Sequence, residues 1–213
     1  MIRNKLLVNL CLGFVKVTGI LPALILLKPK VHLAKNAKRH LPSPCILVSN
    51  HTSLMDFVLY LVIFPFRTIR FLMAEVLFNK GKAFAKFLHL IGGIRVDRDD
   101  KNFGFISDSI EVLDNGGTLG IFPQGRLPVA GKPFPFTVST AFIATHADAP
   151  IVPVFTDGNY GIKKRAHVVI GEAFYLNDYI KEGLSEDEQL KHLTEVLEEK
   201  VYELKNEIAK RKK

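Results

Sequence analysis

The feature that most constrains the fold is an alternation of short strand-like runs with longer helical runs after residue 44. The strand-like runs are "CILVS", "IRFLM", "GIRV", "TLGIF", "IVPVF" and "AHVVI". Helical segments such as "SLMDFVLYLVIF" and "FGFISDSIEVLDN" separate them. This order predicts an α/β domain with a mainly parallel central sheet flanked by helices. At 213 residues the chain is long enough for one such domain, expected over residues 41–183.

An apolar segment precedes this domain and forms the expected N-terminal unit, residues 1–40. It contains "LLVNLCLGFVKVTGILPALILL", which approaches the length of a bilayer span, but Lys16 and Pro22 interrupt it. Basic residues flank it on both sides, namely Arg3, Lys5, Lys28 and Lys30. We therefore expect helices that lie in the lipid headgroup region rather than a simple span. A buried pair of core helices is the alternative.

A different kind of helix is expected over residues 184–213. Ser185 and Glu188 form a capping-box pattern, acidic residues crowd the first turn, and basic residues end the chain. Apolar residues spaced three or four apart make one stripe, namely Leu190, Leu193, Leu197, Val201, Leu204 and Ile208. The stripe is too short for a stable coiled coil, so we expect the helix to pack on the domain and the protein to be a monomer or weak dimer.

The composition narrows the class of partner. Hydrophobic residues make up 48% of the chain and the net charge is +8, which suits a membrane surface, anionic lipids or a phosphorylated substrate. Neither an RNP-like aromatic motif nor a zinc-finger spacing is present, so nucleic acid is not expected. Cys11 and Cys45 lack metal-ligand spacing. We expect no metal, a reducing compartment, and a location at the cytoplasmic face of a membrane.

The stretch "SNHTSLMD" places His51 five residues before Asp56. Neither a straight helix nor a strand brings two such side chains together, so they meet only if the chain turns between them. A turn is expected because the strand "CILVS" ends there and Ser53 with Asp56 resembles the start of a helix. Either the two residues form a dyad, in which Asp56 fixes the imidazole tautomer, or Asp56 merely caps the helix and His51 is a turn histidine.

Two further stretches offer cations for an anionic substrate. In "GGIRVDRDDKN", Arg95 and Arg98 flank Asp97 at a strand end and suit a phosphate, although a surface ion-pair cluster explains them equally well. In "GIFPQGRLPVAGKPFPF", a tight turn at Gly125 with Arg126 and Lys132 offers a second anion site. The alternative there is an ordinary turn with a solvated arginine.

The ordered set "NHTSLMD", "GGIRVDR", "FPQGRLP" and "APIVPV" resembles the four motifs of the glycerophospholipid acyltransferase family, which includes the 1-acylglycerol-3-phosphate O-acyltransferases. The resemblance covers about half of the chain and implies a membrane-bound enzyme of phospholipid biosynthesis. Such an enzyme moves a fatty acyl group from acyl-CoA or acyl carrier protein, as donor substrate rather than cofactor, to a lysophospholipid hydroxyl. The acceptor it implies first is 1-acylglycerol-3-phosphate, which gives phosphatidate.

The resemblance also implies residue roles. His51 would be the general base and Asp56 would orient it, while Arg98, Gly125 and Arg126 would bind the acceptor phosphate. Asn50 would shape the loop. The remaining members of the expected substrate-binding set are Arg95, Gln124 and Lys132.

The third motif departs from the family pattern at Gln124, where the family usually has glutamate. Glutamine keeps its hydrogen-bonding capacity but carries no charge. This departure leaves two alternatives open, namely the same chemistry on another lyso-lipid acceptor, or a non-catalytic lipid-binding member. Hydrolase and nucleotide-binding functions are disfavoured, because the chain has no GxSxG, GxGxxG, Walker or HExxH motif.

Overall fold

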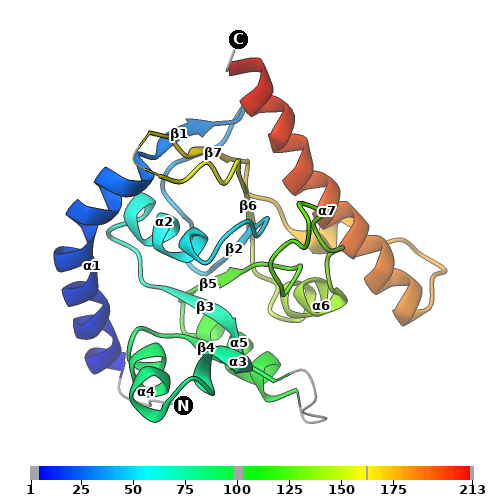
Figure 1. The fold of residues 1–213 in the computed structure, drawn as a ribbon. Coiled ribbons are helices and arrows are strands. Elements are labelled where there is room, and N and C mark those ends of the chain that lie inside the picture. The colour runs from blue at the N-terminus through cyan, green and yellow to red at the C-terminus, as the bar shows by residue number, and fades with distance from the viewer. Residues whose placement is uncertain (1–4, 98–102, 162, 212–213) are drawn as a thin grey trace.

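A computed structural model describes residues 5–97, 103–161 and 163–211. Its centre is a 7-stranded sheet with the order β1-β7-β6-β2-β5-β3-β4 (Figure 1). The strands are β1 (Lys30–Leu33), β2 (Cys45–Ser49), β3 (Ile69–Ala74), β4 (Ile94–Val96), β5 (Thr118–Ile121), β6 (Ile151–Thr156) and β7 (His167–Ile170). Strands β6, β2, β5, β3 and β4 are parallel, and among the seven described strands the β6–β7 pairing is antiparallel. The expected mainly parallel α/β sheet is confirmed.

Helices cover both faces of this sheet. They are α1 (Lys5–Leu27), α2 (Met55–Ile63), α3 (Glu75–Phe78), α4 (Lys82–Leu90), α5 (Gly104–Asp114), α6 (Val138–His146) and α7 (Glu186–Arg211), with a 3₁₀ turn at Leu176–Tyr179. In Figure 1, α1 runs along one side of the sheet and α7 along the other. Because both faces are covered, every residue of β2 is buried.

Successive side chains of β2 divide between two hydrophobic cores. Leu47 packs in the core that contains Leu27 of α1 and Leu59 of α2. Its neighbours Ile46 and Val48 pack in the core that contains the apolar stripe of α7. This follows from the alternation of side chains along a strand, and it fixes β2 in the middle of the molecule.

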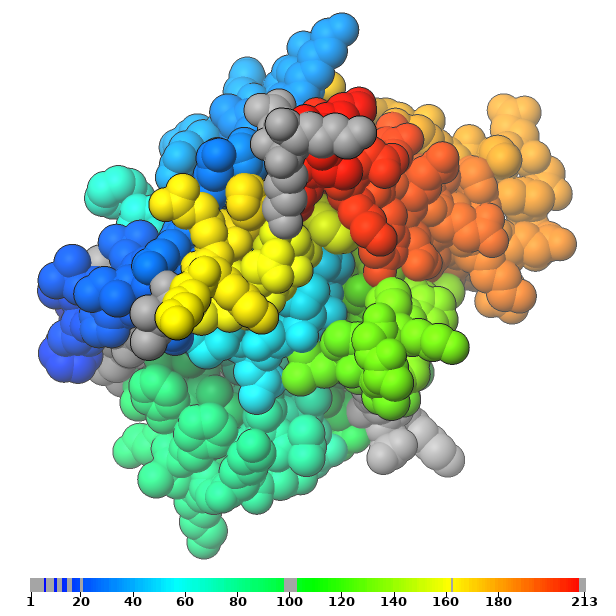
Figure 2. Space-filling view, turned by 45° about the horizontal axis from the view of Figure 1, so that its top comes forward, coloured from blue at the N-terminus to red at the C-terminus, as the bar shows by residue number. Residues whose placement is uncertain are grey.

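The N-terminal segment differs in detail from its expected form. One helix, α1, runs through Pro22 without ending there, and residues 30–33 add an edge strand, β1, that pairs with β7. Figure 2 shows α1 on one flank of the molecule, beside the loop between β6 and β7. Gly161 and Ala166 of that loop donate backbone hydrogen bonds to the last turn of α1. Within the described ranges, no helix combines the length and apolar character needed to cross a bilayer.

The C-terminal helix matches its sequence signals. The Glu188 carboxylate accepts hydrogen bonds from the backbone N–H and the hydroxyl of Ser185, at 3.0 and 2.6 Å. The Ser185 hydroxyl in turn accepts from the Glu188 N–H at 3.4 Å, which completes the capping box. The stripe residues Leu193, Leu197, Val201, Leu204 and Ile208 are buried. Helix α7 therefore packs on the domain, as expected.

Candidate active site

The site lies where the central parallel strands end. Strands β2, β5 and β6 are neighbours and end at Ser49, Ile121 and Thr156. Because they are parallel, the loops that follow them meet at one edge of the sheet, which is where open α/β sheets bind ligands. The loop after β2 carries His51, the loop after β5 carries Gln124, and the loop after β6 carries Tyr160.

The chain turns between His51 and Asp56 as expected. His51 Nδ1 lies 2.8 Å from Asp56 Oδ2. The same oxygen accepts the backbone N–H groups of Thr52 at 2.6 Å and Ser53 at 2.9 Å, while the Ser53 hydroxyl accepts from the Met55 N–H at 3.2 Å. Asp56 therefore holds the imidazole and the backbone of the turn, as the dyad requires, whereas the N-cap position of α2 is Leu54.

Two hydroxyl groups hold the second oxygen of Asp56. The Thr52 hydroxyl donates to Oδ1 at 2.8 Å, and the Tyr160 hydroxyl donates to the same atom. Tyr160 reaches it because the loop after β6 passes close to Thr52. At Gly158, in this loop, φ is +66°, and a Cβ would lie 2.6 Å from the Thr52 hydroxyl. Glycine thus permits the close approach that brings Tyr160 to the carboxylate.

These contacts keep the buried carboxylate ionised. Burial alone raises the pKa of Asp56, but hydrogen bonds from His51, Tyr160 and the backbone of Ser53 and Thr52 outweigh it and leave the pKa below its ordinary value. Burial and the Asp56 charge both raise the pKa of Tyr160, so its hydroxyl remains a donor. An ionised carboxylate only accepts hydrogen bonds, so Nδ1 carries the proton and Nε2 of His51 is left to accept one.

The imidazole is also fixed by aromatic packing. Its ring stacks on Phe122, with centroids 4.3 Å apart and planes 15° apart. Phe122 stacks in turn on Phe71 at 5.7 Å. The His51 side chain is 15% exposed, whereas that of Asp56 is 0% exposed. The carboxylate is therefore sealed in the protein, and the imidazole alone reaches the surface of the site.

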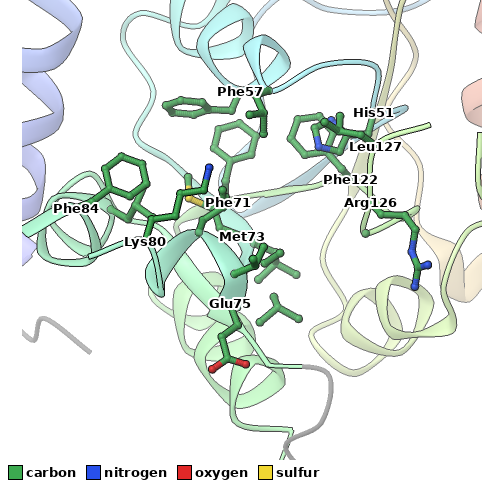
Figure 3. Close-up of a pocket in the computed structure, with 18 residues that line it drawn as sticks. His51, Phe57, Phe71, Met73, Glu75, Lys80, Phe84, Phe122, Arg126 and Leu127 are labelled. Carbon is green, nitrogen blue, oxygen red and sulfur yellow. The ribbon is translucent and has the colours of Figure 1, made fainter. Parts of the chain in front are cut away.

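A cavity of about 620 Å³ opens beside His51. Figure 3 shows His51 and Phe122 at one side of it and Lys80 and Phe84 at the other, with Phe71 between them. Most of the wall is apolar and comes from β3, α2, α3 and α4; it includes Leu54, Phe57, Leu72, Met73, Ala74, Val76, Leu77 and Leu88. The cavity thus combines an imidazole with a mostly apolar wall, which suits a lipid better than a sugar or nucleotide.

Two of the expected substrate-binding residues line this cavity, and a third, Asn50, is buried and holds the adjacent loop. Gly125 and Arg126 line it, and the Arg126 guanidinium lies 4.8 Å from the centre of the Phe134 ring. Asn50 is 5% exposed, and its amide is bonded to both backbone groups of Thr156, each at 2.9 Å. It joins the loop after β2 to the end of β6, in keeping with its expected role in shaping the loop.

Other expected residues are not among those that line the cavity. Arg95 is paired with Glu75 and lies 3.7 Å from Asp97, with its side chain 44% exposed. This arrangement is the surface ion-pair cluster that was the alternative for this motif. Lys132 is exposed, and its backbone pairs with Val129 in a tight turn. Arg98 falls outside the described residues.

Local sequence signals did not identify Tyr160, Thr52 or Phe122. Tyr160 lies 104 positions from Asp56, and only its place in a loop after a buried strand hinted at a role. Thr52 lies inside the first motif and Phe122 begins the third, so membership of these motifs was the sequence feature that could have identified them. Among the described residues, no group of three or more His, Cys, Asp or Glu side chains is placed to hold a metal ion.

Comparison with known proteins gives consistent matches. Residues 28–157 match the family described as Acyltransferase. The chain is 28% identical over 179 residues to the 1-acyl-sn-glycerol-3-phosphate acyltransferase of Bacillus subtilis (strain 168), covering 80% of this chain and 87% of that protein. It is also 28% identical over 112 residues to the 1-acyl-sn-glycerol-3-phosphate acyltransferase beta of Homo sapiens, covering 52% and 40% of the two chains.

A solved structure shares the fold. The crystal structure of the 1-acyl-sn-glycerophosphate (LPA) acyltransferase PlsC from Thermotoga maritima aligns with a TM-score of 0.62 and 24% sequence identity. The alignment covers 91% of this chain and 78% of that chain. The two chains therefore share the same overall fold.

Proposed function

The chain belongs to the acyltransferase family, and we propose that it transfers a fatty acyl group from a thioester to the free hydroxyl of 1-acylglycerol-3-phosphate, giving phosphatidate. The donor is acyl-CoA or acyl carrier protein. The observation that carries the proposal is the His51 imidazole, held by an ionised, fully buried Asp56 and set at the wall of a cavity lined mostly by apolar residues. The names of the Bacillus subtilis and human relatives support the choice of acceptor.

In this mechanism His51 is the general base. Its Nε2 takes the proton from the acceptor hydroxyl, whose oxygen attacks the thioester carbonyl. An O–C bond forms, the C–S bond breaks, and the imidazolium returns its proton to the departing thiolate. Asp56 offsets the positive charge on the ring and holds Nδ1–H throughout. The acceptor hydroxyl is the nucleophile, so no serine is required.

The cavity provides places for both ends of the acceptor. The apolar wall contributed by Phe57, Phe71, Met73 and Leu88 suits an acyl chain, because burying it removes apolar surface from water. Arg126 lines the same cavity, with its guanidinium over the Phe134 ring (Figure 3), and we assign the phosphate to it because Lys132, the other cation of the third motif, does not line the cavity. Lys80 lines the side away from His51 (Figure 3).

The surface of α1 supports a location at a membrane. Its exposed apolar side chains are spaced three or four apart along the helix, namely Leu6, Leu10, Phe14, Val17, Leu21 and Leu24. Exposed basic residues gather where the helix ends, namely Lys28, Lys30, Lys163, Lys164 and Arg165. We propose that this stripe enters the headgroup region of the cytoplasmic face while the basic residues meet anionic lipids. Val17→Ser with Leu21→Ser should then reduce sedimentation with anionic vesicles, and unchanged sedimentation would refute this contact.

The function is tested by an acyl-transfer panel with the purified full chain. Lysophosphatidate and other lysophospholipids are each offered with acyl-CoA and with acyl carrier protein, and the wild type is compared with His51→Ala. We expect turnover by the wild type with lysophosphatidate as the preferred acceptor. Preference for a different lysophospholipid would refute lysophosphatidate as the acceptor. Absence of turnover with every combination of donor and acceptor would refute the enzymatic proposal.

A further inference from the structure

Gln124 is buried next to the active site, and both the oxygen and the nitrogen of its amide make hydrogen bonds. It is 3% exposed. Its Oε1 accepts the backbone N–H of His51 at 3.1 Å, and its Nε2 donates to the Tyr202 hydroxyl at 3.3 Å. Gly125 and Arg126, the next residues along the chain, line the cavity, but Gln124 is not among the described residues that do so.

Tyr202 is a fixed anchor for this contact. It lies on α7, next to the buried Val201, and its ring packs against Phe136 at 5.9 Å and Phe155 at 6.0 Å between centroids. Phe155 belongs to β6 and Phe136 precedes α6. The Tyr202 ring is thus packed against β6 and the loop before α6, and its hydroxyl lies 78 positions from Gln124 in the sequence.

A primary amide is suited to this place because it accepts at one end and donates at the other. The backbone N–H of His51 sits at the point where the chain leaves β2 and turns toward Asp56. A displacement of that backbone would move the imidazole relative to the cavity, and small misplacements of a catalytic base reduce rates strongly. The Gln124 amide therefore links the position of the base to α7.

We propose that Gln124 is a positioning residue that acts through His51, tying the backbone of the base to Tyr202 on α7 without touching the substrate. This rests on the proposed function, in which His51 is the base. It also replaces the expectation that Gln124 binds the acceptor. The two hypotheses predict different effects. If Gln124 bound the acceptor, its substitution would change KM for the acceptor, and substitution of Tyr202 would have no effect.

The test compares Tyr202→Phe, Gln124→Glu and the double variant in steady-state acyl transfer, with Tyr175→Phe as the control. Tyr175 is 44% exposed, so its variant loses a tyrosine hydroxyl on the surface. We expect Tyr202→Phe to lower kcat about three- to tenfold, the effect of one hydrogen bond, with KM within about twofold of the wild type. Tyr175→Phe should leave both constants unchanged.

Gln124→Glu supplies the sharper readout. A carboxylate still accepts from the His51 N–H, and the Tyr202 hydroxyl can turn to donate to it, so the link survives. The new negative charge near the ring favours the imidazolium, so the acid limb of the kcat/KM profile should move to higher pH. In the double variant the buried carboxylate loses its hydroxyl donor, so the loss of kcat should exceed that of Tyr202→Phe alone.

Two results would overturn the proposal. One is a Tyr202→Phe enzyme that behaves like Tyr175→Phe. The other is a Gln124→Glu enzyme that changes only KM for lysophosphatidate, which would make Gln124 a substrate contact. The His51 backbone amide resonance separates this proposal from the proposed function, since it needs no turnover. It should shift in Tyr202→Phe and not in Tyr175→Phe, and an unmoved resonance would overturn the link even in an inactive protein.

Discussion

Two clusters of ionisable side chains can be compared, and each contains a residue from a motif that the sequence marks for chemistry. In the first, His51 meets Asp56 at 2.8 Å. In the second, Arg95 meets Glu75 and Asp97. The Asp56 side chain is 0% exposed and accepts hydrogen bonds from both backbone and side chains. The Arg95 side chain is 44% exposed, and its guanidinium is engaged by carboxylates.

The two clusters differ in burial, and burial decides how firmly each set of side chains is held. Buried Asp56 is held by several hydrogen-bond donors. Because it is held in place, it fixes the tautomer of the His51 ring that faces the cavity. Exposed pairs are screened by water and salt and are typically worth about 0–1 kcal/mol. The first pair is therefore expected to control catalysis, whereas the second is expected to control little.

Removal of the base should have the largest effect. His51→Ala should lower kcat/KM about 10²- to 10⁴-fold, the range for a lost general base, while the circular dichroism spectrum stays that of the wild type. His146→Ala is the matched control, because His146 is exposed on α6. Activity of His51→Ala within about tenfold of the wild type would remove this histidine from the mechanism.

Asp56→Asn should come next. Asparagine cannot accept from all the donors that surround Asp56, so we expect a loss of about 10²-fold in kcat and about 1–3 kcal/mol in the free energy of unfolding. The lowered pKa of Asp56 adds a pH dependence. The ionised carboxylate stabilises the fold above its ordinary pKa of 3.8, and this contribution is lost as the pH falls through the lower folded value. Urea titrations at neutral and acidic pH should show the two proteins converge in acid. A constant difference would contradict the assignment.

Tyr160→Phe sharpens the comparison within the buried pair. The ring remains, but the carboxylate loses one donor, so more of its charge acts on the imidazole. We expect kcat to fall about three- to tenfold and the acid limb of the kcat/KM profile to move to higher pH. An unchanged pH profile would show that Tyr160 supports only the loop.

Arg95→Ala should have the smallest effect, because its pair is exposed. We expect kcat and KM for lysophosphatidate within about twofold of the wild type, since surface ion pairs contribute little. Steady-state assays over a range of lysophosphatidate concentrations measure this. A tenfold rise in KM with kcat preserved would place Arg95 at the substrate phosphate and end the contrast between the two pairs.

The sequence predicted the elements that local patterns encode. The central strands, the capping box at Ser185 and the turn that joins His51 to Asp56 all depend on residues close together in the chain. Strand β1 was missed because Lys30–Leu33 is short, and its pairing with β7 spans most of the chain. Its four residues carry no clear alternation of their own.

The site was less predictable because most of its partners are distant in sequence. Tyr160 reaches Asp56 across 104 positions and Tyr202 reaches Gln124 across 78. Arg95 and Gln124 were also expected to contact substrate, Arg95 as an arginine at a strand end and Gln124 through its place in the third motif. Their hydrogen-bonding groups meet other protein groups once the chain folds, and no local rule indicates such pairing.

The protonation of the His51 ring tests the central claim most directly. Two-bond ¹H–¹⁵N correlation spectra of the ¹⁵N-histidine-labelled protein, with His51 assigned by its absence from His51→Ala, report which ring nitrogen carries the proton. For the neutral ring we predict a proton on Nδ1 and none on Nε2, with the preference weakened in Asp56→Asn. A ring protonated on Nε2, or one that is indifferent to the Asp56 substitution, would contradict the proposed base and its carboxylate support.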